Sequence, residues 1–116
     1  MRYFILTMLL LLFSMGCAQS KAKPITEVSQ NELNSVILID VRTPEEFEAG
    51  HIDNAQNMNW FDKDFTKKMK AIDKKETVYV YCKKGGRSAK AAQLLDSLGY
   101  KKVIDLVGGY DAYSQK

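Results

Sequence analysis

The sequence predicts an α/β domain in which a parallel sheet is covered by helices on both faces. Two observations lead to this prediction. Strand-like segments alternate with helical ones along most of the chain. Residues 36–39 (Val-Ile-Leu-Ile) also form a continuous apolar run, which is typical of a strand buried on both faces. With 116 residues, of which 46% are hydrophobic and 27% charged, the chain has the length and balance of one globular domain.

The individual elements follow from local patterns. Ser29 and Thr43 each stand three residues before a glutamate, which is the capping-box spacing of a helix start. Gly50 and Gly99 end helices, and β-branched and aromatic runs mark strands. We therefore expect strands at 25–28, 36–39, 55–58, 77–81 and 103–107, and helices near 29–34, 43–50, 62–72, 88–98 and after residue 109.

The first residues have the pattern of an export signal. Arg2 precedes the apolar segment 3–15, which falls short of the ~20 residues that a spanning helix needs. Gly16-Cys17 then resembles the bacterial lipoprotein signal, although Ser14 and Met15 are atypical before the cysteine. This resemblance implies a signal peptide at 1–16, a lipid on Cys17 with a short tether to residue 24, and a domain at 25–116 in the cell envelope or periplasm. An ordinary signal peptide or an uncleaved anchor remains the alternative.

Charge and cysteine content exclude several classes of site. The formal net charge of +3 is too small to indicate nucleic-acid binding, and the lysines at 67, 68, 70, 74 and 75 are interpreted as a solvated helix face. Two distant cysteines and one histidine cannot form a zinc framework. We therefore expect no metal, no cofactor and no nucleic-acid partner, and a membrane contact only through a lipid anchor.

The segment around Cys82 has the composition of a reactive thiol site. Cys82 follows a strand and precedes a helix, whose N-terminal amides and dipole favour an anion. Gly85 and Gly86 allow the backbone to curl into an anion-binding nest, and Lys83, Lys84 and Arg87 add positive charge. Such surroundings lower a cysteine pKa from ~8.5 to between ~3.5 and ~7.5. A thiolate beside an oxyanion pocket suits sulfur transfer from thiosulfate or phosphoryl transfer, whereas a buried structural cysteine is the alternative.

Three segments resemble one known family. CKKGGRS (82–88), DVRTPEEFEAGHIDNAQNM (40–58) and LVGGY (106–110) are similar to the signatures of the rhodanese superfamily. The resemblance implies a five-stranded parallel sheet and a persulfide on Cys82, cradled by the amides of residues 83–87. It implies that the loop binds substrate through Lys83, Lys84, Gly85, Gly86, Arg87 and Ser88. Asp40 and Arg42 are expected to brace this loop through charge-assisted hydrogen bonds, and His51 to be a structural hydrogen-bonding residue rather than a catalytic base.

Three functions are compatible with these segments. The first is a sulfurtransferase that passes sulfur from an anionic donor, thiosulfate or a polysulfide, to an external thiol or cyanide. The second is a non-catalytic sulfur-carrier or docking module. The third is a phosphatase or arsenate reductase, against which the loop length argues, because Cys82 and Arg87 are five residues apart. The resemblance assigns this shorter spacing to sulfurtransferases and one residue more to the related phosphatases.

Overall fold

The computed structural model describes residues 21–115. The predictions on the apolar segment 3–15 and on Cys17 lie outside these residues. The elements follow in the order β1 (Lys21–Pro24), the 3-10 helix η2 (Ile25–Glu27), α2 (Gln30–Asn34), β2 (Ile37–Asp40), α3 (Pro44–Ala49), β3 (Gln56–Asn57), α4 (Phe65–Met69), β4 (Thr77–Tyr81), α5 (Gly86–Ser97), β5 (Lys102–Val107) and α6 (Gly109–Ser114). In this part of the chain, no helix has the length and apolar character needed to cross a membrane.

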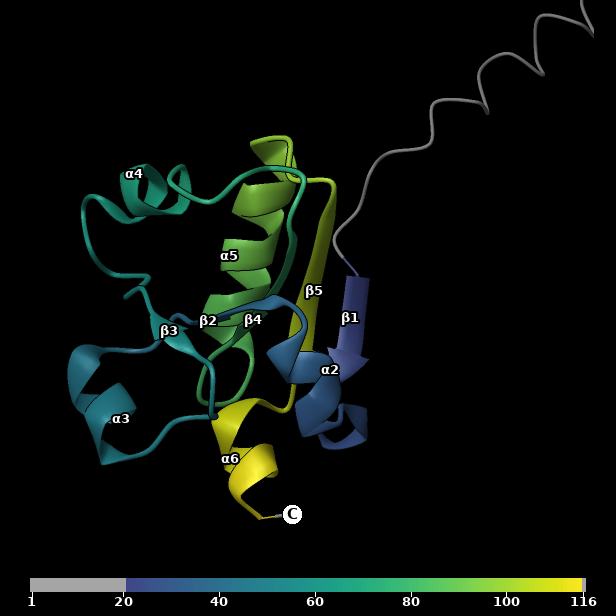
Figure 1. Cartoon of the computed structure of the whole chain (residues 1–116). Helices are drawn as coiled ribbons and strands as arrows, with labels where there is room; N and C mark the ends of the chain where they lie inside the picture. The colour runs from purple at the N-terminus through teal and green to yellow at the C-terminus, as the bar shows by residue number, and fades with distance from the viewer. Residues whose placement is uncertain (1–20, 116) are drawn as a thin grey trace, which may run out of the picture.

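All five strands form one parallel sheet in the order β1-β5-β4-β2-β3. The expected fold class is therefore confirmed. Because the strands are parallel, their carboxyl ends share one edge of the sheet, where ligands bind in folds of this kind. Helix α6 lies at this edge, away from the amino end of β1 (Figure 1). Cys82 follows the carboxyl end of β4 and therefore lies at the same edge.

Each face of the sheet has its own apolar core. On one face, α4 and α5 cover alternate strand residues such as Val78, Val80 and Val103. On the other face, η2, α2 and α6 cover residues such as Tyr79 and Ile104. This alternation follows from the pleat of a strand, which points successive side chains to opposite faces.

The first strand differs from the sequence-based expectation. The expected strand at 25–28 is wrong, because Ile25 to Glu27 form a 3-10 turn that buries Ile25 and Val28. The strand lies instead at Lys21–Pro24, within the segment expected to be a tether, and pairs with β5. Its largely polar sequence carries no strand pattern, because an edge strand with mostly exposed side chains needs no apolar alternation.

The helix expected at 62–72 is also shorter than its periodicity indicated. Phe65 and Met69 are buried as expected and Ile72 packs against the same core, but α4 spans only Phe65–Met69. Asp64 stands at its start without a side-chain capping bond, and turns flank the helix at both ends. The apolar spacing therefore predicted the buried face correctly and the length incorrectly.

Candidate active site

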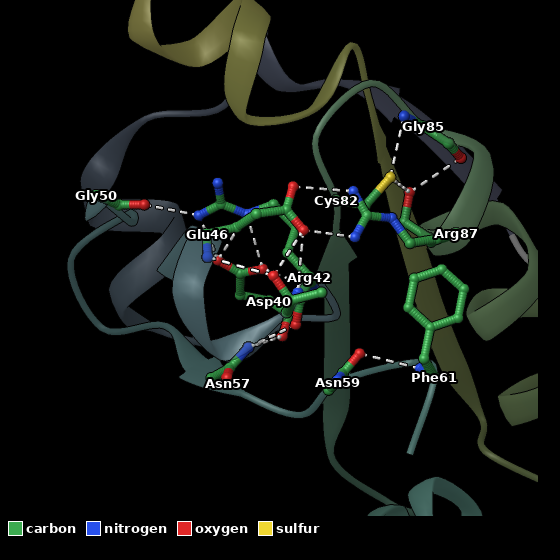
Figure 2. Close-up of polar contacts among 12 residues, drawn as sticks. Asp40, Arg42, Glu46, Gly50, Asn57, Asn59, Phe61, Cys82, Gly85 and Arg87 are labelled. Carbon is green, nitrogen blue, oxygen red and sulfur yellow. Dashed lines mark hydrogen bonds and ion pairs between the residues drawn. The ribbon is translucent and has the colours of Figure 1, made fainter. Parts of the chain in front are cut away.

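The cysteine loop forms a tight cradle between β4 and α5. Cys82 follows the last residue of β4 and is 1% exposed. The backbone N–H of Gly85 donates a hydrogen bond to Cys82 Sγ over 3.0 Å (Figure 2). Gly85 has φ of +138°, a backbone conformation that favours glycine. The start of α5 at Gly86 thus lies directly beside the sulfur atom.

Ser88 is the second polar contact of the sulfur. Its Oγ lies 3.4 Å from Cys82 Sγ and donates to the carbonyl oxygen of Gly85 over 3.2 Å. Ser88 is fully buried in the first turn of α5. The structure therefore brings Cys82, Gly85 and Ser88 together as the sequence predicted. Lys83 and Lys84 are exposed. Of the backbone amides of residues 83–87, that of Gly85 donates a hydrogen bond to the sulfur.

Arg87 is held by a glutamate that the sequence analysis used only as a helix cap. Its two terminal nitrogens bind the carboxylate of Glu46 at 2.7 and 3.1 Å (Figure 2). Glu46 also accepts from the backbone N–H of Thr43, completing the capping box of α3. The hydrogen bonds from Arg87 hold the pKa of Glu46 at about 2 despite partial burial. Glu46 lies within the family-like segment 40–58, and this was the only feature of the sequence that pointed to it.

Asp40 and Arg42 form a buried ion pair. Arg42 Nη2 lies 2.7 Å from Asp40 Oδ2, and the same nitrogen donates to the carbonyl oxygen of Gly50. Burial lowers the pKa of Arg42, but hydrogen bonding to Asp40 and its charge outweigh this effect and raise it. These bonds join the two residues to each other and to Gly50, and none of them goes to residues 82–88. That the pair braces the loop stays a prediction.

Direct support of the loop comes from the turn that begins α6. The N–H groups of Tyr110 and Asp111 donate to the carbonyl oxygens of Cys82 and Lys83 at 2.8 and 3.0 Å. Arg42 lies 4.4 Å from the centre of the Tyr110 ring and so reaches the loop through this turn. A Cβ atom on Gly109 would overlap the backbone of Cys82 and Lys83, so only glycine fits there.

His51 and Phe61 lie around this centre in different roles. His51 Nδ1 is 2.8 Å from the carbonyl oxygen of Phe47, and its ring stacks on the Phe47 ring. These contacts agree with the structural role expected for His51. Phe61 is 67% exposed and its ring lies 5.7 Å from the guanidinium of Arg87, so it forms an apolar rim beside the loop (Figure 2). No sequence pattern had indicated Phe61.

Comparison with known proteins identifies the family. A family model described as a rhodanese-like domain matches residues 26–116. The chain belongs to the rhodanese-like family. The matched range includes the cysteine loop after β4 and the glycine turn before α6.

Similar proteins carry sulfurtransferase names. This rhodanese-like domain is 36% identical to "Thiosulfate sulfurtransferase 16, chloroplastic" of Arabidopsis thaliana, over 66% of this chain and 72% of that protein. It is also 36% identical to "Adenylyltransferase and sulfurtransferase UBA4" of Candida albicans, over 84% of this chain but only 26% of that protein. The chain thus spans about a quarter of the second relative's length.

The fold agrees with solved rhodanese-like structures. A rhodanese-related protein of Thermoplasma volcanium superimposes with a TM-score of 0.72 and 25% identity. The match covers 82% of this chain and 91% of that one. It supports the parallel five-stranded architecture described above.

Proposed function

We propose that this rhodanese-like domain is a sulfurtransferase that moves sulfane sulfur from thiosulfate or a polysulfide through a persulfide on Cys82. The observation that carries the proposal is the 3.0 Å hydrogen bond from the Gly85 amide to Cys82 Sγ at the start of α5. A backbone donor and a helix N-terminus at the sulfur stabilise negative charge on it. The name of the Arabidopsis relative supports thiosulfate as the donor class.

The proposed reaction has two displacement steps. The Cys82 thiolate attacks the outer sulfur of thiosulfate, an S–S bond to Cys82 forms, and the S–S bond of thiosulfate breaks to release sulfite. Cyanide or an external thiolate then attacks the outer sulfur of the persulfide, which returns Cys82 as a thiolate. Cys82 is the one free cysteine among residues 21–115, and Cys17 is the only other cysteine of the chain. We therefore infer that the sulfur acceptor is external.

The residues around Cys82 have distinct proposed roles. The Gly85 amide and Ser88 hydroxyl contact the sulfur that changes charge during the reaction. Arg87, held by Glu46, keeps a positive charge next to the loop. Lys83 and Lys84 are exposed, which suits attraction of an anionic donor.

A mass spectrum of the purified full chain after incubation with thiosulfate tests this function. We expect one added sulfur atom on Cys82 that is lost on treatment with cyanide, with thiocyanate as the product. Cys82→Ser should abolish both signals, and Cys17→Ser, which removes the other thiol, should leave them intact. Arg87→Ala should lower turnover while the protein stays folded. Substantial transfer by Cys82→Ser would exclude the mechanism.

This experiment, together with an assay of aryl phosphate hydrolysis, separates the two alternatives. A persulfide that forms on Cys82 with negligible turnover on cyanide and small thiols would identify a sulfur carrier that serves a dedicated protein. Hydrolysis of an aryl phosphate that depends on Cys82, without any sulfur adduct, would identify a phosphatase. Either result would replace the sulfurtransferase proposal.

We further propose that the protein is exported and held in the cell envelope by a lipid on Cys17. The support is the sequence of residues 2–17, with its basic start, apolar segment and glycine-cysteine pair.

A further inference from the structure

Lysines gather at the amino edge of the sheet, opposite the edge at which Cys82 lies. β1 begins at Lys21 and β5 at Lys102, and Thr77 at the start of β4 pairs with Lys102. Figure 1 shows the amino ends of β1 and β5 at the end of the molecule away from α6. The sulfur-transfer function proposed above uses none of these lysines.

Two loops that carry lysines are held together at this edge. The backbone N–H of Lys101, before β5, donates to the carbonyl oxygen of Lys74, before β4, over 3.1 Å. The hydroxyl of the buried Tyr100 donates to the carbonyl oxygen of Ile72, in the same segment as Lys74, over 3.0 Å. A Cβ atom on Gly99 would lie 3.8 Å from Lys74 Nζ, so this lysine side chain lies against the other loop. The lysines of both loops therefore share one surface.

The fold presents these lysines in a way that the sequence did not indicate. The lysines at 70, 74 and 75 were interpreted as part of a solvated helix face, but α4 ends at Met69 and turns follow it. These turns lead to the start of β4, next to the loop before β5. Six exposed lysines result, which we call the basic edge: Lys21, Lys70, Lys74, Lys75, Lys101 and Lys102.

The basic edge carries an excess of positive charge. Its loops also contain three carboxylates, those of Asp73, Glu76 and Asp96. The neighbouring Lys23 is paired with Glu32 at 2.9 Å and adds no net charge. Six lysines against three carboxylates leave an excess of three, which equals that of the whole chain with its 17 basic and 14 acidic residues. The other charges of the chain therefore balance, and the excess is concentrated at this edge.

We propose that the basic edge binds the anionic headgroups of a phospholipid bilayer. The inference rests on the envelope location proposed above, because Lys21 follows the expected lipid site, Cys17, by only four residues. Clusters of roughly four to eight lysines or arginines next to a membrane attachment are typical of binding to anionic lipids. A polybasic surface also adds to the hold of an acyl chain on a membrane. The lipid attaches the chain, and the lysines orient the domain.

Chemical labelling of lysines in the full chain tests this surface. The chain is reconstituted into vesicles of phosphatidylcholine alone or mixed with phosphatidylglycerol, acetylated at its amines, and analysed residue by residue by mass spectrometry. We expect phosphatidylglycerol to lower labelling of the basic edge about threefold or more, because these amines then lie against an anionic surface. Labelling of Lys83 and Lys84, at the other edge, should not change. High salt should restore the labelling without releasing the chain, because it screens charge.

Charge reversal makes the result specific. Lys74→Glu with Lys101→Glu should abolish the protection of the remaining lysines of the basic edge. Lys83→Glu with Lys84→Glu is the matched control, because it makes the same change in net charge at the other edge, and it should keep the protection. Unchanged labelling on phosphatidylcholine alone shows that both variants stay folded. Equal labelling of the basic edge in both kinds of vesicle, or protection that survives Lys74→Glu with Lys101→Glu, would overturn the proposal.

This readout is independent of the lipid and of sulfur transfer. A chain without a lipid on Cys17 that still shows the protection supports the basic edge and contradicts only the lipid proposal. A chain that carries the lipid but shows no protection contradicts the basic edge and leaves the lipid in place. Sulfur transfer is measured separately by the adduct on Cys82, which does not depend on the lysines of the opposite edge.

Discussion

Glu46 links helix α3 to the cysteine loop, 41 residues further along the chain. Its ion pair with Arg87 is about one quarter exposed on each side chain, so solvent only partly screens it. The lowered pKa of Glu46 means that the folded state favours its charged form. The stability that this preference contributes is present above the ordinary value of 4.5 and is lost as the pH falls toward about 2.

Glu46→Gln should therefore remove part of the acid sensitivity of folding. Glutamine can still accept from the Thr43 amide and keep the capping box, so the substitution isolates the ion pair. At neutral pH we expect a loss on the order of 1–2 kcal/mol, and below about pH 2 little difference from the parent chain. Urea denaturation at several pH values measures this. Glu45→Gln on the exposed side of α3 is the control, and equal losses in both variants would contradict the prediction.

Sequence reasoning identified the chemistry of single residues better than their partners. The position of Cys82 between a strand and a helix predicted its cradle, because local chain geometry produces it. The partner of Arg87 could not be derived in this way, because the two residues meet only after α3 packs beside the loop. Asp40 and Arg42 were correctly expected to form charge-assisted hydrogen bonds. The bond from Arg42 to the carbonyl oxygen of Gly50 could not be predicted, because the fold brings these two residues together.

At the scale of elements, the turn from β5 into α6 packs against the cysteine loop and donates hydrogen bonds to its backbone. Gly109 has φ of +64°, and its Cα lies against the backbone of Cys82 and Lys83. A Cβ atom there would come within 2.6 Å of the Cys82 carbonyl oxygen. The turn and the loop therefore cannot both keep their positions if residue 109 carries a side chain.

Gly109→Ala should destabilise the domain and displace the cysteine loop. We expect a loss of about 2 kcal/mol or more from strained backbone and overlap, together with a large loss of sulfur transfer. Thermal denaturation and thiocyanate formation measure the two effects. Gly86→Ala is the comparison for stability, because a Cβ atom at Gly86 meets open space and φ is not positive there. Equal stability of the two variants would show that the close approach is unimportant.

Among the elements, β1 shows the limit of pattern-based prediction. The apolar residues Ile25 and Val28 suggested a strand, yet they are buried by a 3-10 turn, because a short run with two apolar residues fits either conformation. The true strand is polar and is defined by its pairing with β5. The central strands β2, β4 and β5 were predicted to within one residue, because both of their faces are buried and their sequences are apolar.

At the scale of the whole molecule, the export proposal can be tested by substitution of Cys17. In the native host, the parent chain should be found in the membrane fraction and released by detergent. Cys17→Ala should be found in the soluble fraction or retained with its uncleaved signal, because the site of lipid attachment is absent. Cys82→Ala, which removes the other thiol, should not change the distribution. Release of the parent chain by high salt alone would show that no lipid holds it.

The position of β1 sets how such a protein would stand on a bilayer. β1 begins at Lys21, four residues after Cys17, and an extended chain spans at most ~3.6 Å per residue, or about 14 Å. Cys82 follows the carboxyl end of β4, at the opposite edge of the sheet. A lipid on Cys17 would therefore hold the domain close to the bilayer, with the amino end of β1 nearest the membrane. Cys82 would then face the aqueous compartment, where a donor and an acceptor arrive from solution.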